Sequence, residues 1–356
     1  MKVIKLSRNV QIPISRHSGV NESKILHRDW EYVVLDKAVN LLSSEYENDL
    51  TVSDITPTWP TDIWKPSGIL TIICPGGIGD MLVLRYVIHE FKCRYPGMRV
   101  CVAAAPGDDF WLSDYADGVI TYPPLYNTVR STDYVVSMED EVRQSQNQNA
   151  YEVFARVLGM QLDNVNIREV MPLAVSSAIR DMVKNALPRS GRKKIGIQVA
   201  SAAHYRSYPR HLTALLALEL STKFDVYIVG SIMQEIRWIK DGVEVAPPDH
   251  VYDLCGKFDT NEEFFAVVDM MDALITPDSS VLHIGAWLNK PTIGLFSITR
   301  GDTTTKYYPT VRYIQGQADC APCLKIAEIP DCGERFCKAM LAINAFEVAD
   351  MVANML

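Results

Sequence analysis

The chain has 356 residues, of which 48% are hydrophobic, and a formal net charge of −8 at pH 7. At roughly 100–200 residues per domain, this length predicts two hydrophobic cores. The net charge is negative and no basic block is longer than the one at 191–194, and both observations argue against a nucleic-acid partner. No apolar run reaches ~18 residues and the first residues form no apolar signal region, so we expect a cytoplasmic protein without a transmembrane segment.

Residues 1–65 differ in pattern from the rest of the chain. Apolar positions recur at helical spacing over 30–42, and a turn-rich connector follows at 56–61. We expect an N-terminal extension that packs on the first domain, and its role does not follow from the sequence.

From residue 68 the chain alternates between apolar runs typical of buried strands and segments with helical spacing. A basic, turn-rich segment at 188–194 interrupts the alternation, which then restarts. The pattern predicts an α/β protein with two doubly wound, Rossmann-like domains at 66–188 and 189–356. The expected strands are 69–74, 98–105, 118–121, 133–136, 195–199, 224–229, 273–276 and 292–296, and the expected helices are 81–91, 150–158, 178–186, 212–221, 261–271, 279–288 and 345–356.

The first strand, 69–74, leads through a glycine-rich turn into a helix. Gly77 and Gly79 allow the backbone to approach a ligand closely, because neither has a Cβ atom. Asp80 follows at the helix N-terminus, where its carboxylate could act as a general base. The alternative is a tight strand–helix turn in which Asp80 is only an N-terminal cap.

A second strand–turn–helix covers residues 273–287. Asp278 ends the strand, and Ser279 or Ser280 could cap the helix while leaving its N–H groups free to hold a diphosphate. His283 lies one turn into the helix, where it would face that ligand. The alternative is a capped helix with a histidine packed in the core.

Four of the eight cysteines, Cys320, Cys323, Cys332 and Cys337, lie close together near the end of the chain. The spacing C-x2-C-x8-C-x4-C would suit a closed, structural zinc site with four thiolate ligands. Reduced thiols without metal and disulfides remain the alternatives. The other four cysteines are scattered, and we expect small buried side chains there.

Several motifs in order resemble the heptosyltransferases of lipopolysaccharide biosynthesis, the ninth glycosyltransferase family, over about residues 68–350. The resemblance implies the two-domain GT-B fold, with two Rossmann-like domains facing each other across a cleft. The motifs are Gly79-Asp80, Arg206-Ser-Tyr-Pro209, Val229-Gly230 with Glu235, Leu254-Cys-Gly-Lys257, Pro277-Asp-Ser-Ser-Val-Leu-His283, Lys290-Pro-Thr-Ile-Gly-Leu-Phe296 and Thr299.

The resemblance also implies an inverting transfer of a sugar from a nucleotide-activated donor to an acceptor hydroxyl, with Asp80 as the base. The donor diphosphate would contact Arg206, Ser279, Ser280 and Thr299, the sugar would lie near Asp278 and His283, and the nucleoside near Gly230 and Glu235. No Asp-x-Asp donor loop is present, so we expect no metal or other cofactor in catalysis. The expected acceptor is a glycan or a glycolipid, and a glycolipid would bring the chain into peripheral contact with a membrane.

The chain departs from the family pattern around the donor site. Arginine replaces the usual lysine at Arg206, and serine replaces a usual glycine at Ser280. These changes leave the identity of the sugar open. Two other functions remain: a sugar transferase that acts on a modified nucleobase in DNA, and a non-catalytic nucleotide-sugar-binding protein.

Overall fold

The structure is a computed structural model of the chain. It describes residues 1–15, 21–55, 67–138, 148–188, 190–201, 204–230, 236, 238–240, 243–323 and 336–356. The chain forms two compact units: Met1–Ser145 with Ala150–Val165, and Asn166–Leu356 with the short segment at 146–149. Among the described residues, no helix combines the length and the apolar composition that crossing a bilayer requires.

The division between the units differs from the one expected at 188/189. Helix α7 (Ser177–Ala186), which we expected at the end of the first domain, belongs to the second unit. It packs against α9 (Asn261–Asp269), and Arg180 of α7 forms an ion pair of 3.3 Å with Asp269. The turn-rich segment near 188–194 therefore leads into a strand of the second unit and does not separate the two units.

The first unit begins with a small antiparallel module. Its three-stranded sheet has the order β4-β1-β5, and helix α1 packs on it beside the hairpin β2–β3. A compact apolar core includes Ile4, Tyr32 and Leu42. The bounds are β1 (Lys2–Leu6), β2 (Val10–Ser15), β3 (Asn21–Leu26), β4 (Glu31–Val34), α1 (Asp36–Tyr46), a 3₁₀ turn (Glu47–Asp49) and β5 (Leu50–Asp54).

The helix expected over 30–42 was therefore partly wrong. Tyr32, Val33 and Val34 are all buried in strand β4, and the helix begins only at Asp36. A short apolar run buried on both faces lacks the alternation that identifies a strand, so its spacing also fits a helix.

The module is attached to the parallel sheet of the same unit. Val33 N–H donates to Pro124 O at 2.9 Å, and Lys24 Nζ donates to Pro123 O at 2.7 Å. Burial lowers the pKa of Lys24. Met1 and Leu35 share an apolar cluster with residues of the parallel sheet, so the extension packs on this sheet as expected.

The parallel sheet of the first unit has the order β8-β7-β6-β9, and the long helix α2 packs beside α3 and α6. The four strands expected here are confirmed within one or two residues at each end. The bounds are β6 (Ser67–Ile73), α2 (Ile78–Arg94), β7 (Gly97–Ala104), α3 (Asp109–Leu112), β8 (Gly118–Thr121), α4 (Tyr126–Val129), β9 (Tyr134–Ser137) and α6 (Ala150–Val157).

The second unit holds a six-stranded parallel sheet with the order β14-β11-β10-β15-β16-β17. Its strands are β10 (Lys194–Gln198), β11 (Asp225–Val229), β14 (Val251–Asp253), β15 (Ala273–Pro277), β16 (Thr292–Phe296) and β17 (Val311–Gln315), with a separate hairpin of β12 (Trp238–Lys240) and β13 (Val243–Val245). The further helices are α8 (Arg210–Ser221), α10 (Ser280–Trp287), α11 (Gly301–Thr304), α12 (Lys338–Leu341) and α13 (Ala345–Ala353), with 3₁₀ turns at Ile167–Glu169 and His204–Arg206.

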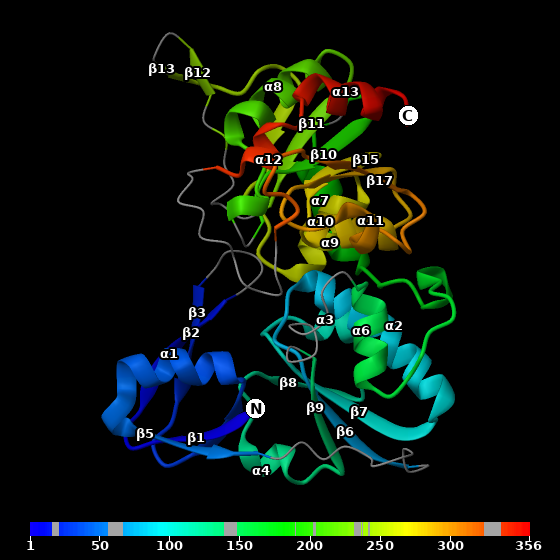
Figure 1. Ribbon diagram of the computed structural model, residues 1–356. Coiled ribbons are helices and arrows are strands. Elements are labelled where there is room, and N and C mark those ends of the chain that lie inside the picture. Colours follow the sequence, from blue (N-terminus) through cyan, green and yellow to red (C-terminus); the bar gives the residue numbers. More distant parts are fainter. Residues whose placement is uncertain are drawn as a thin grey trace. The chain divides into compact units, whose positions relative to one another are not determined.

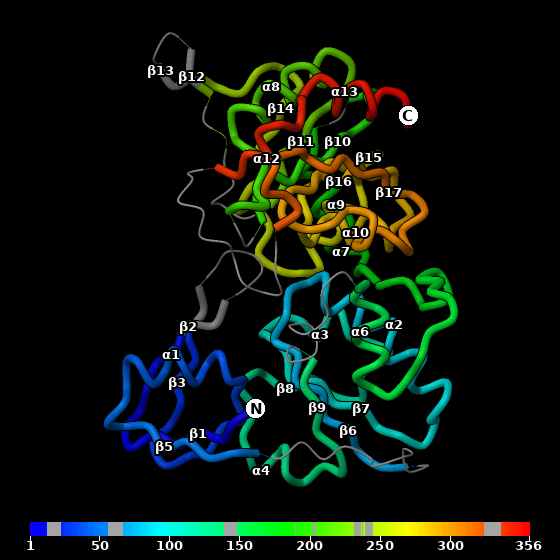
Figure 2. The backbone as a smooth tube through the Cα atoms, in the orientation of Figure 1, coloured from blue at the N-terminus to red at the C-terminus, as the bar shows by residue number. Residues whose placement is uncertain are grey.

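Helices cover both faces of this sheet (Figure 1). Helices α8 and α13 lie on one face, and α7, α9 and α10 lie on the other. Figure 2 shows that the C-terminal helix α13 runs beside α8, although the two are far apart in sequence. Ile195 and Ile197 of β10 pack against Leu216 of α8 and Val348 of α13. The doubly wound fold class is confirmed.

Candidate functional site

The glycine turn after β6 places Asp80 in the first turn of α2. Its Oδ2 atom accepts a hydrogen bond of 2.8 Å from the N–H of Gly77, the N-cap residue. A Cβ atom at Gly76 would lie 2.5 Å from the same oxygen, so only glycine fits there. Asp80 is half-buried and caps the helix. A carboxylate has two oxygens, so capping through one of them is compatible with proton transfer at the other.

In the second unit, four of the predicted donor residues, Arg206, Asp278, Ser279 and Ser280, lie together beyond the carboxyl ends of β10 and β15. From β10 the chain proceeds outward through β11 and β14, and then returns to β15 and proceeds through β16 and β17 in the other direction. In open parallel sheets, ligands bind where the strand order reverses in this way. Gln198 ends β10 and Pro277 ends β15, so the residues that follow both strands border this switch point.

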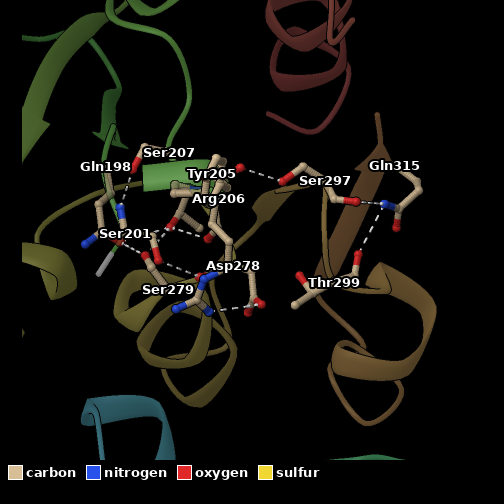
Figure 3. A network of polar contacts seen from close by, with 12 residues as sticks. Gln198, Ser201, Tyr205, Arg206, Ser207, Asp278, Ser279, Ser297, Thr299 and Gln315 are labelled. Carbon is tan, nitrogen blue, oxygen red and sulfur yellow. Dashed lines mark hydrogen bonds and ion pairs between the residues drawn. The ribbon is translucent and has the colours of Figure 1, made fainter. Parts of the chain in front are cut away.

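Gln198 connects the two strands to helix α10 (Figure 3). Its Oε1 atom accepts hydrogen bonds from Thr276 Oγ1 at 3.0 Å, from Val281 N–H at 3.3 Å and from Ser279 Oγ. Its Nε2 atom donates to Ser280 Oγ at 3.3 Å. Gln198 is 5% exposed. One buried amide therefore fixes both serines at the start of α10.

The expected serine cap was wrong in its details. Ser279 is the N-cap residue of α10, but within the described part of the chain its hydroxyl bonds to Gln198 and Thr276 and not to the helix backbone. The amide oxygen of Gln198 instead takes the N–H of Val281. Both serines are half-buried, and the positive end of the helix dipole remains at this position.

Arg206 and Asp278 form an ion pair, with Nη1 3.3 Å from Oδ2. Their side chains are 27% and 10% exposed. Arg206 ends a 3₁₀ turn whose position is fixed by neighbouring bonds, since Ser201 N–H donates to Ser207 Oγ at 3.0 Å and Ser201 Oγ donates to Asp278 O at 3.3 Å. The structure thus brings together the cation expected near the diphosphate and the carboxylate expected near the sugar.

A second glutamine stabilises the loop after β16. Gln315 Nε2 donates to Ser297 O at 3.1 Å and to Thr299 O at 3.2 Å, and its Oε1 accepts from Gly301 N–H at 3.0 Å. Ser297 Oγ donates to Tyr205 O at 2.9 Å, which connects this loop to the 3₁₀ turn that carries Arg206. The Oγ1 atom of Thr299 is buried and has no hydrogen-bond partner among the residues that the structure describes.

His283 lies one turn into α10, and its Nδ1 atom is 2.7 Å from the hydroxyl of Tyr308. The two rings meet edge to face, with centroids 5.7 Å apart. Tyr308 is 3% exposed, so the imidazole of His283 is oriented by the hydroxyl of a buried side chain.

Gly230 follows the last residue of β11 and has φ +137°, which favours glycine at the strand end. Its carbonyl accepts from Gly256 N–H at 3.0 Å. Glu235, the other residue expected near the nucleoside, lies outside the described residues.

The four-cysteine zinc site expected from the sequence lies only partly within the described residues. Cys337 is 8% exposed and packs in the apolar core beneath α12, whereas Cys320 is exposed and Cys323 is half-buried. Among the described residues, no three His, Cys, Asp or Glu side chains converge as metal ligands would. Cys332 lies outside them.

The sequence did not identify Gln198, Ser201, Gln315 or Tyr308. Gln198 carried a usable signal, because it is a polar residue at the carboxyl end of an otherwise apolar strand. The contacts of Gln315 and Tyr308 join segments far apart in sequence, so no local pattern indicates them.

This arrangement suits a ligand with an anionic group and several hydroxyls. The helix N-terminus and the Arg206 guanidinium attract a diphosphate, and serine hydroxyls can donate or accept hydrogen bonds. The Asp278 carboxylate can accept hydrogen bonds from sugar hydroxyls, and the His283 imidazole can accept or donate them.

Comparisons with known structures agree with the fold described above. E. coli ADP-heptose lipopolysaccharide heptosyltransferase II superposes with a TM-score of 0.54 at 16% identity, over 80% of this chain and 98% of that one. A family 9 glycosyl transferase from Veillonella parvula gives 0.60 at 14% identity, over 81% and 97%. The iron-containing dodecameric glycosyltransferase TibC from enterotoxigenic E. coli gives 0.58 at 12% identity, over 81% and 78%. These likenesses confirm the GT-B type of fold.

A comparison with curated proteins gives no match. The family model described as glycosyltransferase family 9 (heptosyltransferase) matches residues 128–332, which is more than half of the chain. The chain therefore belongs to glycosyltransferase family 9, and it is a glycosyltransferase.

Proposed function

We propose that this protein transfers a sugar from an ADP-activated donor, with ADP-heptose as the first candidate, to a hydroxyl of a glycan or glycolipid. Two observations from similar proteins support this choice of donor. An E. coli heptosyltransferase of similar fold is described with ADP, and TibC is described in complex with ADP-D-beta-D-heptose. Membership of family 9 supports the reaction class.

The observation that carries the proposal is the polar cluster at the switch point of the second unit. Arg206 and the N-terminus of α10 together supply positive charge where β10 and β15 end. As the bond from the anomeric carbon to the diphosphate breaks, the leaving oxygen gains negative charge. Preorganised cations and helix N–H groups stabilise that charge, so the mechanism needs no metal ion. Asp278 and His283 contribute hydrogen bonds to the sugar.

The first unit would supply the acceptor side of the reaction. The acceptor oxygen attacks the anomeric carbon opposite the leaving diphosphate, a new C–O bond forms, and the configuration inverts. The hydroxyl proton goes to the carboxylate of Asp80, and the electron pair of the broken bond goes to the diphosphate. The N-terminal module is part of this unit. We place the reaction in the cytoplasm, with peripheral membrane contact when the acceptor is a glycolipid.

The Asp80→Asn variant tests the proposed base, because the cap and the base can be separated. The asparagine carbonyl can still accept the hydrogen bond from Gly77 N–H, so the cap survives, but the amide cannot accept the acceptor's proton. We expect turnover with ADP-heptose to fall by ~10²–10⁴ while the melting temperature and ADP affinity stay close to wild type. Asp109→Asn, at the start of α3 in the same unit, is the matched control.

Near-normal turnover of Asp80→Asn at saturating substrate would show that Asp80 is only a cap. A panel of other nucleotide sugars, tested by the melting temperature and by slow donor hydrolysis, determines whether the donor is ADP-heptose.

A further inference from the structure

Gln198 fixes which of the two serines at the start of α10 can donate a hydrogen bond to a ligand. The orientation of its amide follows from Val281, whose backbone N–H can only donate. The atom that faces this N–H at 3.3 Å must therefore be the oxygen, Oε1, and the amide nitrogen must face Ser280.

The two serines consequently have opposite polarity. Ser279 donates its only hydroxyl proton to Gln198 Oε1, so its remaining lone pairs can only accept from a ligand. Ser280 accepts from Gln198 Nε2, so its own proton remains to be donated. Within the described residues no other hydrogen bond of the Ser280 hydroxyl is present, and the side chain is half-buried.

We propose that Gln198 is a positioning residue that makes Ser280 a hydrogen-bond donor to the diphosphate and Ser279 an acceptor for a hydroxyl of the donor sugar. A diphosphate at neutral pH offers acceptors only, so it pairs with Ser280. A sugar hydroxyl can donate, so it pairs with Ser279. Ser280 stands where the family pattern has glycine, so this contact is particular to chains with a side chain at that position. The inference rests on the proposed nucleotide-sugar donor.

The two serine variants give opposite results if this assignment is right. Calorimetry with ADP should show Ser280→Ala raising the Kd about tenfold, as expected for one hydrogen bond to a charged group, and Ser279→Ala changing it less than about twofold. With ADP-heptose, Ser279→Ala should reduce the affinity advantage of the sugar nucleotide over ADP. Ser280→Ala should leave this advantage nearly unchanged.

Gln198→Glu tests the positioning role itself. The new carboxylate still accepts from Thr276, Ser279 and Val281, but it has no N–H group to donate to Ser280, whose proton then turns toward it. We expect the Kd for ADP to rise at least tenfold, and Ser280→Ala to add less than about twofold in this background. Gln317→Glu adds the same charge at an exposed position of the same unit and should change the Kd less than about twofold.

Melting temperatures show that each variant is folded, and if Gln198→Glu does not fold, the serine pair decides alone. An equal or larger effect of Ser279→Ala on ADP binding, or full additivity of Gln198→Glu and Ser280→Ala, would overturn the inference. If neither ADP nor any ADP-sugar binds, the proposed function fails together with it. If ADP binds and sugar is transferred with the serine effects reversed, only the inference fails.

Discussion

Because Arg206 is paired with Asp278, we predict that removal of the Asp278 carboxylate tightens the binding of nucleoside diphosphate. In the structure, Arg206 Nη1 lies 3.3 Å from Asp278 Oδ2, so part of its charge is neutralised before a ligand arrives. Asp278→Asn frees this guanidinium and removes a negative charge from the anion site. The backbone carbonyl of Asp278, which accepts from Ser201 Oγ, is unaffected by the substitution.

The magnitude follows from the burial of the pair. Two unit charges about 4 Å apart interact by ~1 kcal/mol in water and by ~4 kcal/mol at an effective dielectric constant of ~20. The side chains are 27% and 10% exposed, and ion pairs near a surface contribute ~0–1 kcal/mol after desolvation and entropy. We therefore expect a gain of ~1 kcal/mol, or about fivefold tighter ADP binding.

Calorimetry with ADP measures this gain, and the Arg206→Ala background tests its cause. Without the guanidinium, Asp278→Asn should tighten binding by much less. Asp302→Asn, which breaks the exposed pair of Arg300 and Asp302 in the same unit, is the matched control and should not change the Kd. Turnover of Asp278→Asn should fall, because the sugar loses a charged acceptor. Weaker ADP binding by Asp278→Asn would refute the reasoning.

Three further predictions concern stability and the glycine turn. Cys337→Ser should lower the free energy of unfolding by ~1–3 kcal/mol in urea titrations, because it buries a hydroxyl in the core. The same change at exposed Cys320 should alter the free energy of unfolding by less than ~0.5 kcal/mol. Comparable losses for both variants, together with loss of a bound metal, would instead favour a thiolate site. Burial alone would raise the pKa of Asp117, but the hydrogen bond from Val100 N–H and the ammonium of Lys92 outweigh it and lower the pKa. Asp117→Asn should therefore reduce the free energy of unfolding by ~1 kcal/mol at pH 7, and this loss should disappear as the pH falls below ~4. A loss that does not depend on pH would contradict this account. Gly76→Ala should displace Asp80 from its cap and reduce both the melting temperature and turnover. Gly191→Ala, where a Cβ atom meets nothing within 4 Å, should leave turnover unchanged. Equal effects of the two substitutions would argue against the close approach at Gly76.

The sequence predicted the parts of the fold that depend on local pattern. The two parallel sheets follow from apolar runs bounded by glycine, proline and polar residues, and strand β16 has the expected limits. Strands β14 and β17 were missed, because β14 has only three residues and β17 has no fully buried side chain and alternates apolar with polar residues only briefly. The strands of the N-terminal module were missed too, and the apolar run of β4 was read as helical.

The sequence named candidate site residues but not the partners of their side chains. Asp278 and the two serines follow a strand of the second unit and Asp80 follows a strand of the first, positions at which the sequence pattern predicts ligand contacts, whereas Arg206 was identified from its motif in the family resemblance. The pairing of Arg206 with Asp278 and the polarity that Gln198 gives the serines depend on rotamers and tertiary contacts between separate segments. No spacing in the sequence encodes those choices.

The most direct test of the central claim is a time course of ADP release from ADP-heptose, followed by NMR, for wild type and Asp80→Asn. ADP binding by both forms is measured in parallel. We predict that the wild type releases ADP, slowly to water and faster with an acceptor glycan, and that Asp80→Asn binds ADP equally well but releases it ~10²–10⁴ times more slowly. Equal rates for the two forms, or no release by the wild type from any nucleotide sugar, would contradict the account.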